Sequence, residues 1–295
     1  MVAHTKSTPS VVRDYVALTK PRIISLLLLT AVGGMVLAAK GLPDPAIAIS
    51  VLVGGYLAAG GAHALNHYLE RDLDRRMART SQRPVASGRV SPIQALMFGV
   101  VLNILAFLVL VVVVNVPAAL ITMSDTGIYV FVYTIGLKTS PPQNIVIGGA
   151  AGAVPPMVGW VAVTGSLDLA AWYMFAIIFF WTPPHFWALA LLMKDDYAKA
   201  GVPMLPVVAS LRETKRQILL YTVVLVALTW MFFTTEAVGL VYMLGAILLG
   251  GVFVFYNTRL LRGEGIDGAK ASYLYSLLYL ALLFGVIMVD AIVQI

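Results

Sequence analysis

Cysteine is absent from the 295 residues of this sequence, so disulfide bonds and thiolate metal ligands are excluded. Charged residues are also scarce, at 12% of the chain, whereas 60% of the residues are hydrophobic and the mean hydropathy is +0.90. A water-soluble domain cannot cover so much apolar surface. The composition therefore predicts an integral membrane protein.

The apolar runs lack the period-2 alternation of an outer-membrane barrel, which favours membrane-spanning helices. No cleavable signal pattern is present, because the N-terminal tail is polar and no small-residue cleavage site follows the first apolar segment. Nine runs are long enough to cross a hydrocarbon layer of about 30 Å. They cover 22–39, 46–68, 93–113, 117–137, 145–164, 169–193, 217–235, 238–257 and 272–294. We predict an all-α membrane protein with an N-terminal tail over 1–21 and one nine-helix bundle over 22–295.

Lysine and arginine are distributed unevenly between the two sides that nine spans would define. All but one of the 20 basic residues fall in the tail and the even-numbered loops. They are Lys6, Arg13, Lys20, Arg22, Arg71, Arg75, Arg76, Arg79, Arg83, Arg89, Lys138, Lys194, Lys199, Arg212, Lys215, Arg216, Arg259, Arg262 and Lys270. Because cytoplasmic segments carry an excess of these residues, we expect the tail and even loops in the cytoplasm and the C-terminus outside. The net charge of +6 is therefore a topology signal, and no nucleic-acid binding is expected.

A concentrated charged stretch, NHYLERDLDRRMARTSQRP, occupies 66–84 directly after the second apolar run. Asn66, Glu70 and Asp74 are spaced i, i+4, i+8, so they fall within about 80° of one another on a helix. Magnesium usually binds one or two carboxylates together with substrate phosphates, and the following arginines can contact phosphate through two hydrogen bonds each. The alternative is a solvated loop whose acids pair with its own arginines.

A second charged stretch, LMKDDYAKAGVPMLP, follows the sixth apolar run. Lys194, Asp195, Asp196 and Tyr197 would lie at the same bilayer face as the first stretch. Two acid clusters on one face suit a diphosphate held by two metal ions. The alternative is that Lys194 and Lys199 simply neutralise the acids of a helix end.

These segments resemble the UbiA-type intramembrane prenyltransferases, whose first signature is Asn-x-x-x-Asp-x-x-x-Asp. Within that superfamily the sequence is similar to the protohaem IX farnesyltransferases, or haem O synthases. The similarity is carried by TKPRI (19–23), LNHYLERDLDRRMARTSQRP (65–84), PPQNIVIGGAAGAVPPMVGW (141–160) and FWTPPHFWALALLMKDDYAKAGVPMLP (180–206). It extends over about residues 15–290.

The resemblance implies a UbiA-type bundle with a central cavity open to the cytoplasmic side. It also implies Mg²⁺-dependent transfer of a farnesyl group from farnesyl diphosphate to a vinyl group of haem B. Water addition would complete haem O, a precursor of haem A. The implied metal ligands are Asn66, Glu70 and Asp74, with Asp195 and Asp196 as candidates for a second ion. The candidate substrate-binding residues are Lys138, Arg79, Arg83, Lys194, Tyr197 and His185. Haem A synthase or terminal oxidase assembly factors are the expected partner proteins.

The sequence departs from the family pattern at two positions. Glu70 stands where the family usually has Asp, which keeps the charge but extends the side chain by one methylene. Thr139 follows Lys138 where the family often has Arg, so one phosphate contact is in doubt.

His185 lies in TPPHFW, where we expect Pro183 and Pro184 to break the sixth span within the membrane. Irregular backbone at that depth is tolerated only where it is buried or lines a cavity, and an intramembrane ionisable residue is a functional candidate. His185 would bind haem iron, orient a propionate, or simply pair with a freed carbonyl. Asp125, within the fourth span, must likewise find a partner or face the cavity.

Two alternative functions remain open on the sequence alone. Another UbiA-type aromatic prenyltransferase would share the acid clusters but lack TPPHFW. A haem B carrier would bind haem without any dependence on Mg²⁺ or diphosphate.

Overall fold

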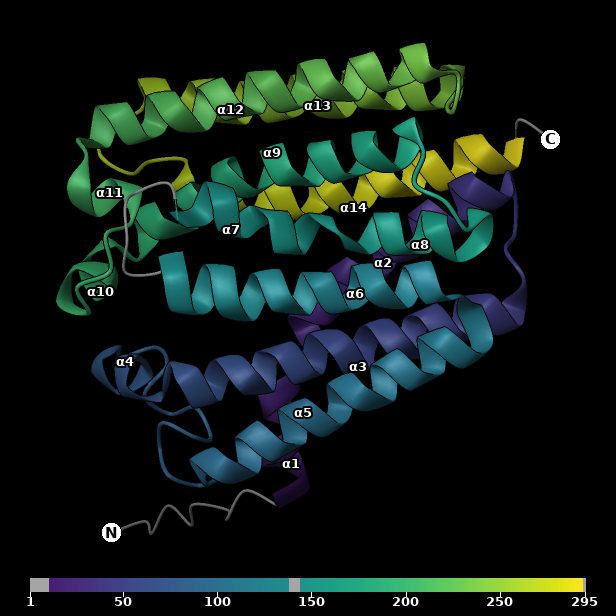
Figure 1. Cartoon of the computed structure of the whole chain (residues 1–295). Coiled ribbons are helices and arrows are strands. Elements are labelled where there is room, and N and C mark those ends of the chain that lie inside the picture. The colour runs from purple at the N-terminus through teal and green to yellow at the C-terminus, as the bar shows by residue number, and fades with distance from the viewer. Residues whose placement is uncertain (1–10, 138–143, 294–295) are drawn as a thin grey trace, which may run out of the picture.

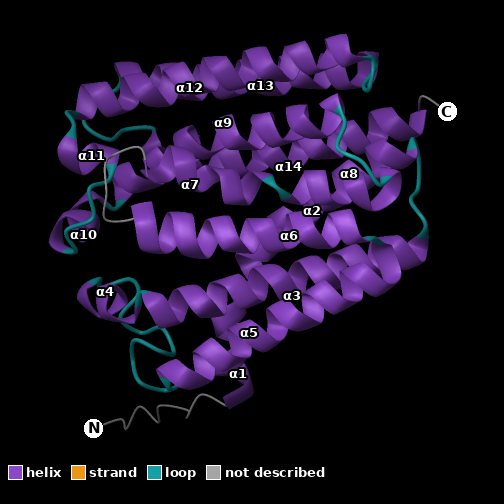
Figure 2. Ribbon diagram, viewed as in Figure 1, coloured by secondary structure: helices purple, strands orange, loops and turns teal. Residues whose placement is uncertain are grey.

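The computed structural model describes residues 11–137 and 144–293, and in that part of the chain every regular element is a helix. The helices run roughly parallel or antiparallel to one another in a single bundle (Figure 1, Figure 2). In chain order they are α1 (Val11–Thr19), α2 (Pro21–Ala39), α3 (Pro45–Leu69), α4 (Arg71–Arg76), α5 (Pro92–Val109), η1 (Leu110–Val114), α6 (Val116–Gly127), η2 (Ile128–Leu137), α7 (Asn144–Ala153), α8 (Pro155–Thr164), α9 (Leu169–Leu192), α10 (Lys194–Lys199), α11 (Leu205–Val208), α12 (Leu211–Phe232), η3 (Phe233–Thr235), α13 (Leu240–Arg262) and α14 (Ala269–Val293).

Eight helical segments of the described residues are long and apolar enough to cross a membrane, so the chain is a multi-pass membrane protein. The predicted span 117–137 coincides with α6 and the π-helix η2 that continues it. Its apolar part, Val116–Val132, is shorter than the other eight. The count of nine membrane spans therefore stays a prediction.

Local sequence signals start several helices where the apolar runs begin. Asp44 caps α3 by accepting hydrogen bonds from the backbone amides of Ala46 (2.8 Å) and Ile47 (3.1 Å), ahead of a proline in the first turn. Ser91 and Gln94 form a reciprocal capping box at the start of α5. Each cap satisfies amides that would otherwise lack a partner at the end of the helix.

The sixth span differs from expectation, because α9 continues without a break through Pro183 and Pro184. Proline removes an amide donor and crowds the carbonyl four residues earlier. Transmembrane helices tolerate this where hydroxyl side chains and packed neighbours compensate. Thr182 Oγ1 donates to the carbonyl of Ile178 (2.9 Å), and both prolines are buried.

Small residues let the N-terminal and central helices approach closely. A Cβ atom at Gly34 would collide with the Pro156 carbonyl, and one at Gly159 with the Ala31 carbonyl, so α2 and α8 touch backbone to backbone. The fifth predicted span is divided at Val154, where α7 ends and α8 begins.

The charged connections gather at one end of the bundle, on the left in Figure 1, where α4, α10 and α11 lie. Leu73 and Met77 of the first charged stretch share an apolar cluster with Tyr197 of the second. Lys215 Nζ donates to the Gly263 carbonyl (2.8 Å), which attaches the connection between α13 and α14 to the start of α12 at this end. The shared apolar cluster shows that the two acid stretches are neighbours in space, as expected if both lie at the same face of the bilayer.

Candidate active site

Asn66, Glu70 and Asp74 occupy successive turns at the end of α3. The helix ends at Leu69, and Glu70 separates it from α4. Backbone hydrogen bonds from Glu70 N to Asn66 O (2.9 Å) and from Asp74 N to Glu70 O (2.8 Å) nevertheless keep the one-turn spacing. All three side chains are buried, with 2%, 5% and 2% of their surface exposed, respectively. The three residues thus keep the predicted one-turn spacing, although not on one uninterrupted helix.

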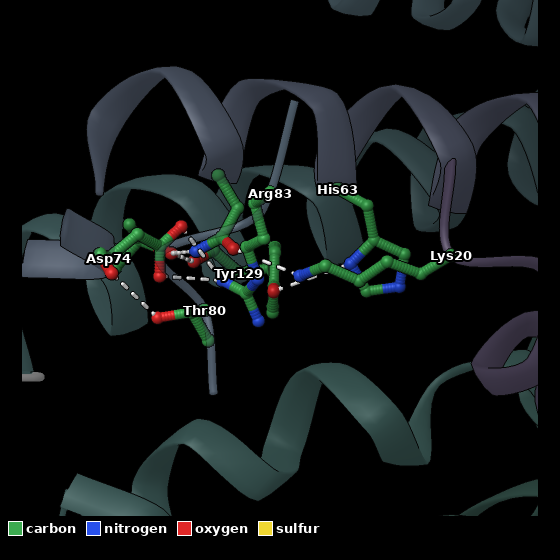
Figure 3. A network of polar contacts seen from close by, with 8 residues as sticks. Lys20, His63, Asp74, Thr80, Arg83 and Tyr129 are labelled. Atoms are coloured by element: carbon green, nitrogen blue, oxygen red, sulfur yellow. Dashed lines mark hydrogen bonds and ion pairs between the residues drawn. The ribbon is translucent and has the colours of Figure 1, made fainter. Parts of the chain in front are cut away.

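Two cationic side chains face these oxygen donors (Figure 3). Lys20 Nζ donates to Asn66 Oδ1 (3.1 Å), and Arg83 Nη1 donates to both carboxylate oxygens of Asp74 (2.8 and 2.9 Å). Thr80 Oγ1 adds a hydrogen bond to the Asp74 carbonyl (3.0 Å). A buried charge without an opposite charge is costly, so Arg83 stabilises the buried carboxylate of Asp74.

Lys20 is the site residue that the sequence did not reveal. In the sequence it serves only as one of the basic residues that indicate topology, because it lies 46 residues from Asn66. It occupies the joint between α1 and α2 in a left-handed conformation (φ 53°). This turn aims the side chain back toward α3, whereas Arg22, two residues later, is exposed.

Tyr197 of α10 connects the two charged stretches electrostatically. Burial raises the pKa of Tyr197, with Arg79 and Arg83 lowering it and Asp196 and Glu70 raising it. The phenol is 7% exposed, so it can serve as a neutral hydrogen-bond donor beside the acids. Tyr197 therefore lies near acidic and basic side chains from both charged stretches.

The second acid stretch is more open than the first. Asp195 and Lys194 are exposed, and Asp196 is half-buried. Arg79 is likewise exposed. Lys138, another predicted phosphate contact, lies outside the described residues.

Asp72 takes no part in the buried trio. Its carboxylate pairs with Arg75 Nη1 (3.2 Å), as expected for a residue on the opposite face, and its side chain is 62% exposed. Asp125 Oδ1, within α6, is buried and makes no hydrogen bond among the described residues. No role follows from the surroundings of Asp125.

Among the residues that the structure describes, no three histidine or acidic side chains are close enough together to form a metal site on their own. The donor set at the end of α3 nonetheless fits magnesium, which takes oxygen ligands and usually completes its shell with water and phosphate. Asn66, Glu70 and Asp74 provide one amide and two carboxylate groups, and the bonds of Asn66 and Asp74 to Lys20 and Arg83 show that these oxygens attract positive charge.

His185 is buried in α9 and held by α14. Its Nδ1 lies 2.7 Å from Ser276 Oγ, and its ring stacks between Trp181 (centroids 4.4 Å apart) and Tyr273 (5.0 Å). Trp181 Nε1 also donates to the Ser276 carbonyl (2.8 Å). The interaction predicted with a carbonyl freed by the prolines is absent from the described contacts of this ring.

Residues 27–287 match the UbiA prenyltransferase family. The chain is 50% identical over 282 residues to a protoheme IX farnesyltransferase of Roseiflexus castenholzii, covering 96% of this chain and 53% of that protein. It is also 50% identical over 282 residues to one of Symbiobacterium thermophilum, covering 95% and 94%. The chain therefore spans about half the length of the first relative and nearly all of the second.

Solved structures share the fold at low sequence identity. The structure of a digeranylgeranylglyceryl phosphate synthase superposes with a TM-score of 0.78 at 18% identity, over 95% of this chain and 98% of that one. A UbiA homologue from Archaeoglobus fulgidus bound to GPP and Mg²⁺ gives 0.71 at 18% identity, over 93% and 99%. The helical bundle matches the fold of these structures, and the family match over residues 27–287 shows that the chain belongs to the UbiA prenyltransferase family.

Proposed function

We propose that this chain transfers a farnesyl group from farnesyl diphosphate to a vinyl group of haem B, with addition of water, giving haem O and diphosphate. Its main support is the buried cluster in which Lys20 and Arg83 face Asn66, Glu70 and Asp74. Such a mixture of cations and oxygen donors suits a metal-bound diphosphate. The specific reaction is supported by the relatives named protoheme IX farnesyltransferase.

The proposed chemistry begins with heterolysis of the bond between C1 of the farnesyl group and the diphosphate oxygen. The electron pair leaves with the diphosphate, where Lys20 and Arg83 are placed to stabilise the developing negative charge. The π electrons of the vinyl group then form the new carbon–carbon bond to C1. Water adds to the resulting cationic carbon next to the porphyrin, and one proton is released.

Mg²⁺ bound at this site would neutralise diphosphate charge as the leaving group departs. Asn66, Glu70 and Asp74 would hold it, and Asp195 and Asp196 are candidates for a second ion. Arg83, which pairs with Asp74 in this structure, and Lys20, which donates to Asn66, would then be the nearest cations for the diphosphate oxygens. Arg79, Lys138, Lys194 and Tyr197 are proposed as outer contacts to the diphosphate.

The orientation in the membrane follows from the basic residues, which favour a cytoplasmic end containing α4 and α10. The absence of cysteine gives a clean test by labelling with a membrane-impermeant maleimide. A single cysteine at Gln82 should be protected in intact cells, whereas one at Ser166 should be labelled from outside. Labelling with the opposite pattern would reverse the proposed topology. We propose the bilayer as the site of action, and haem A synthase or oxidase assembly factors as partners that receive the product.

The activity can be tested by mass spectrometry with purified protein in detergent. The protein receives haem B, farnesyl diphosphate and Mg²⁺, with EDTA and geranylgeranyl diphosphate as controls. We expect a Mg²⁺-dependent product with the mass of haem B plus one farnesyl group and one water molecule.

Two other outcomes would overturn this proposal in different ways. Prenylation of an aromatic quinone precursor with no haem product would assign another substrate within the family. Haem binding that is indifferent to Mg²⁺ and never accompanied by farnesyl transfer would indicate a carrier.

A further inference from the structure

The environment of His185 defines which of its ring nitrogens is available. Ser276 Oγ donates its single hydrogen to the Tyr273 carbonyl (2.6 Å), one turn earlier in α14. The same oxygen lies 2.7 Å from His185 Nδ1, so Nδ1 must donate and Ser276 Oγ must accept. The neutral imidazole consequently carries its lone pair on Nε2.

Nε2 makes no hydrogen bond with any residue that the structure describes. The ring itself cannot turn freely, because Trp181 and Tyr273 stack on its two faces and Ser276 holds its Nδ1. Metal-bound histidines typically show this pattern, in which the distal nitrogen donates to an oxygen that orients the ring. An acceptor nitrogen also repels a carboxylate, which argues against a propionate partner.

We propose that His185 Nε2 is the axial ligand to the iron of the haem substrate, with Ser276 as its positioning residue. This inference rests on the proposed function, since it assigns the haem-binding side of that same reaction. α9 carries His185 seven residues before its last residue, Leu192, a separation of about 10 Å along the helix. The helix that binds the haem substrate through its iron would thus lead directly into the charged stretch that begins at Lys194, which we propose contacts the diphosphate.

The other two described histidines are less suited to this role. His63 and His67 are buried on α3 beside the cations Lys20 and Arg83, where an anion is favoured over an iron centre. The contact of His63 Nδ1 with the Tyr129 hydroxyl is long, at 3.4 Å. Neither ring nitrogen of His67 has a hydrogen-bond partner among the described residues. His63 therefore supplies a matched control for substitution of a buried imidazole.

The test compares haem B with metal-free protoporphyrin IX, using the purified full chain in detergent. Absorption, electron paramagnetic resonance and the ferrous iron–histidine stretch in resonance Raman spectra report the axial ligand. Fluorescence reports binding of the metal-free porphyrin. The variants are His185→Ala, with and without added imidazole, Ser276→Ala and the control His63→Ala.

We expect His185→Ala to lose the axial imidazole signature, to regain it with imidazole, and to bind metal-free porphyrin as the wild type does. Ser276→Ala should keep the signature but bind haem about tenfold more weakly, in the range seen when a hydrogen-bond partner of a metal ligand is removed. His63→Ala should leave the spectrum unchanged.

Failure of the ligand assignment and failure of the proposed function give different results. A wild-type protein that farnesylates haem, together with an unchanged spectrum in His185→Ala, would overturn the ligand alone. Equal losses of haem and metal-free porphyrin binding in His185→Ala would assign the residue a purely structural role. A wild-type protein that binds no haem would overturn both proposals.

Discussion

Two buried polar clusters in this bundle are built differently. At the end of α3, Arg83 pairs with Asp74 and Lys20 with Asn66. Between α12, α13 and α14, the neutral side chains of Thr222, Asn257 and Ser272 are wholly buried. Asn257 Nδ2 donates to Thr222 Oγ1 (2.8 Å), and Ser272 Oγ donates to Asn257 Oδ1 (2.5 Å).

The difference indicates that the neutral cluster stabilises the bundle, whereas the charged cluster serves the proposed reaction. Each member of the neutral cluster finds its partner within the protein, so that cluster joins three helices and needs no ligand. The charged cluster is held by one ion pair and one hydrogen bond from a lysine, and under the proposed function a metal ion and a diphosphate would offer these groups equivalent contacts. Substitutions should therefore damage activity at one cluster and stability at the other.

The largest effect is expected for Asp74→Ala. The variant removes a carboxylate from the proposed metal site, and turnover should fall by roughly 10³-fold, the upper range for one electrostatic group at a reacting centre. Haem binding, measured by absorption, should remain close to that of the wild type. Asp72→Ala is the matched control, because Asp72 is an exposed acid two residues away, and its turnover should be nearly unchanged. Retained turnover of Asp74→Ala at saturating Mg²⁺ would refute the proposed clamp.

A smaller effect on activity is expected for Lys20→Met. Loss of a charge-assisted hydrogen bond to the diphosphate should lower kcat/KM for farnesyl diphosphate roughly 10- to 100-fold, while haem affinity stays constant. Steady-state kinetics at varied farnesyl diphosphate measures this change, with the exposed neighbour Arg22→Gln as control. Equal effects in the two variants would mean that Lys20 acts only through general surface charge.

Asn257→Leu tests the role of the neutral cluster between α12, α13 and α14. Leucine would leave the hydroxyl groups of Thr222 and Ser272 without their interhelical partner, at a cost of about 1–2 kcal/mol in unfolding free energy. The thermal unfolding midpoint in detergent should fall while turnover per folded molecule is maintained. A variant of normal stability but low turnover would place this cluster in the catalytic machinery.

The smallest effect concerns Tyr197 and high pH. Because burial raises its pKa in the folded protein, the phenol contributes stability that is fully present below pH 10 and is lost as pH rises through the folded pKa. Between pH 9 and 11 the wild type should lose more stability than Tyr197→Phe, as measured by thermal unfolding at each pH. Parallel losses in both proteins would show that Tyr197 does not titrate differently on folding.

The helices could be predicted largely from hydropathy, because each crossing demands a long apolar run. Their ends could not, since charged residues continue a helix beyond the apolar layer. α12 begins at Leu211, before the predicted 217, because Ser210 Oγ caps it by accepting from the Glu213 amide (3.1 Å). α1 was missed within the predicted tail for the same reason, as it is short and carries Asp14, which pairs with Arg89 (3.0 Å).

The spacing of Asn66, Glu70 and Asp74 was predictable because it is local, one helical turn at a time. The roles of Lys20 and Ser276 were not predictable, because Lys20 lies 46 residues from Asn66 in the sequence and Ser276 lies 91 residues from His185. Pro183 and Pro184 were misjudged as a helix break because local propensity does not include the packing that keeps α9 continuous. Contacts between distant segments, and not residue types, were the missing information.

The proposed function requires the charged end of α3 to bind a metal-bound diphosphate. The most direct test is calorimetric binding of a non-hydrolysable farnesyl thiolodiphosphate to the wild-type protein with Mg²⁺, to the same protein with EDTA, and to Asp74→Ala with Mg²⁺. We expect tight binding in the first case and loss of binding in the other two. Equal binding in all three would contradict this requirement, because neither the metal ion nor Asp74 would then be needed to hold the diphosphate.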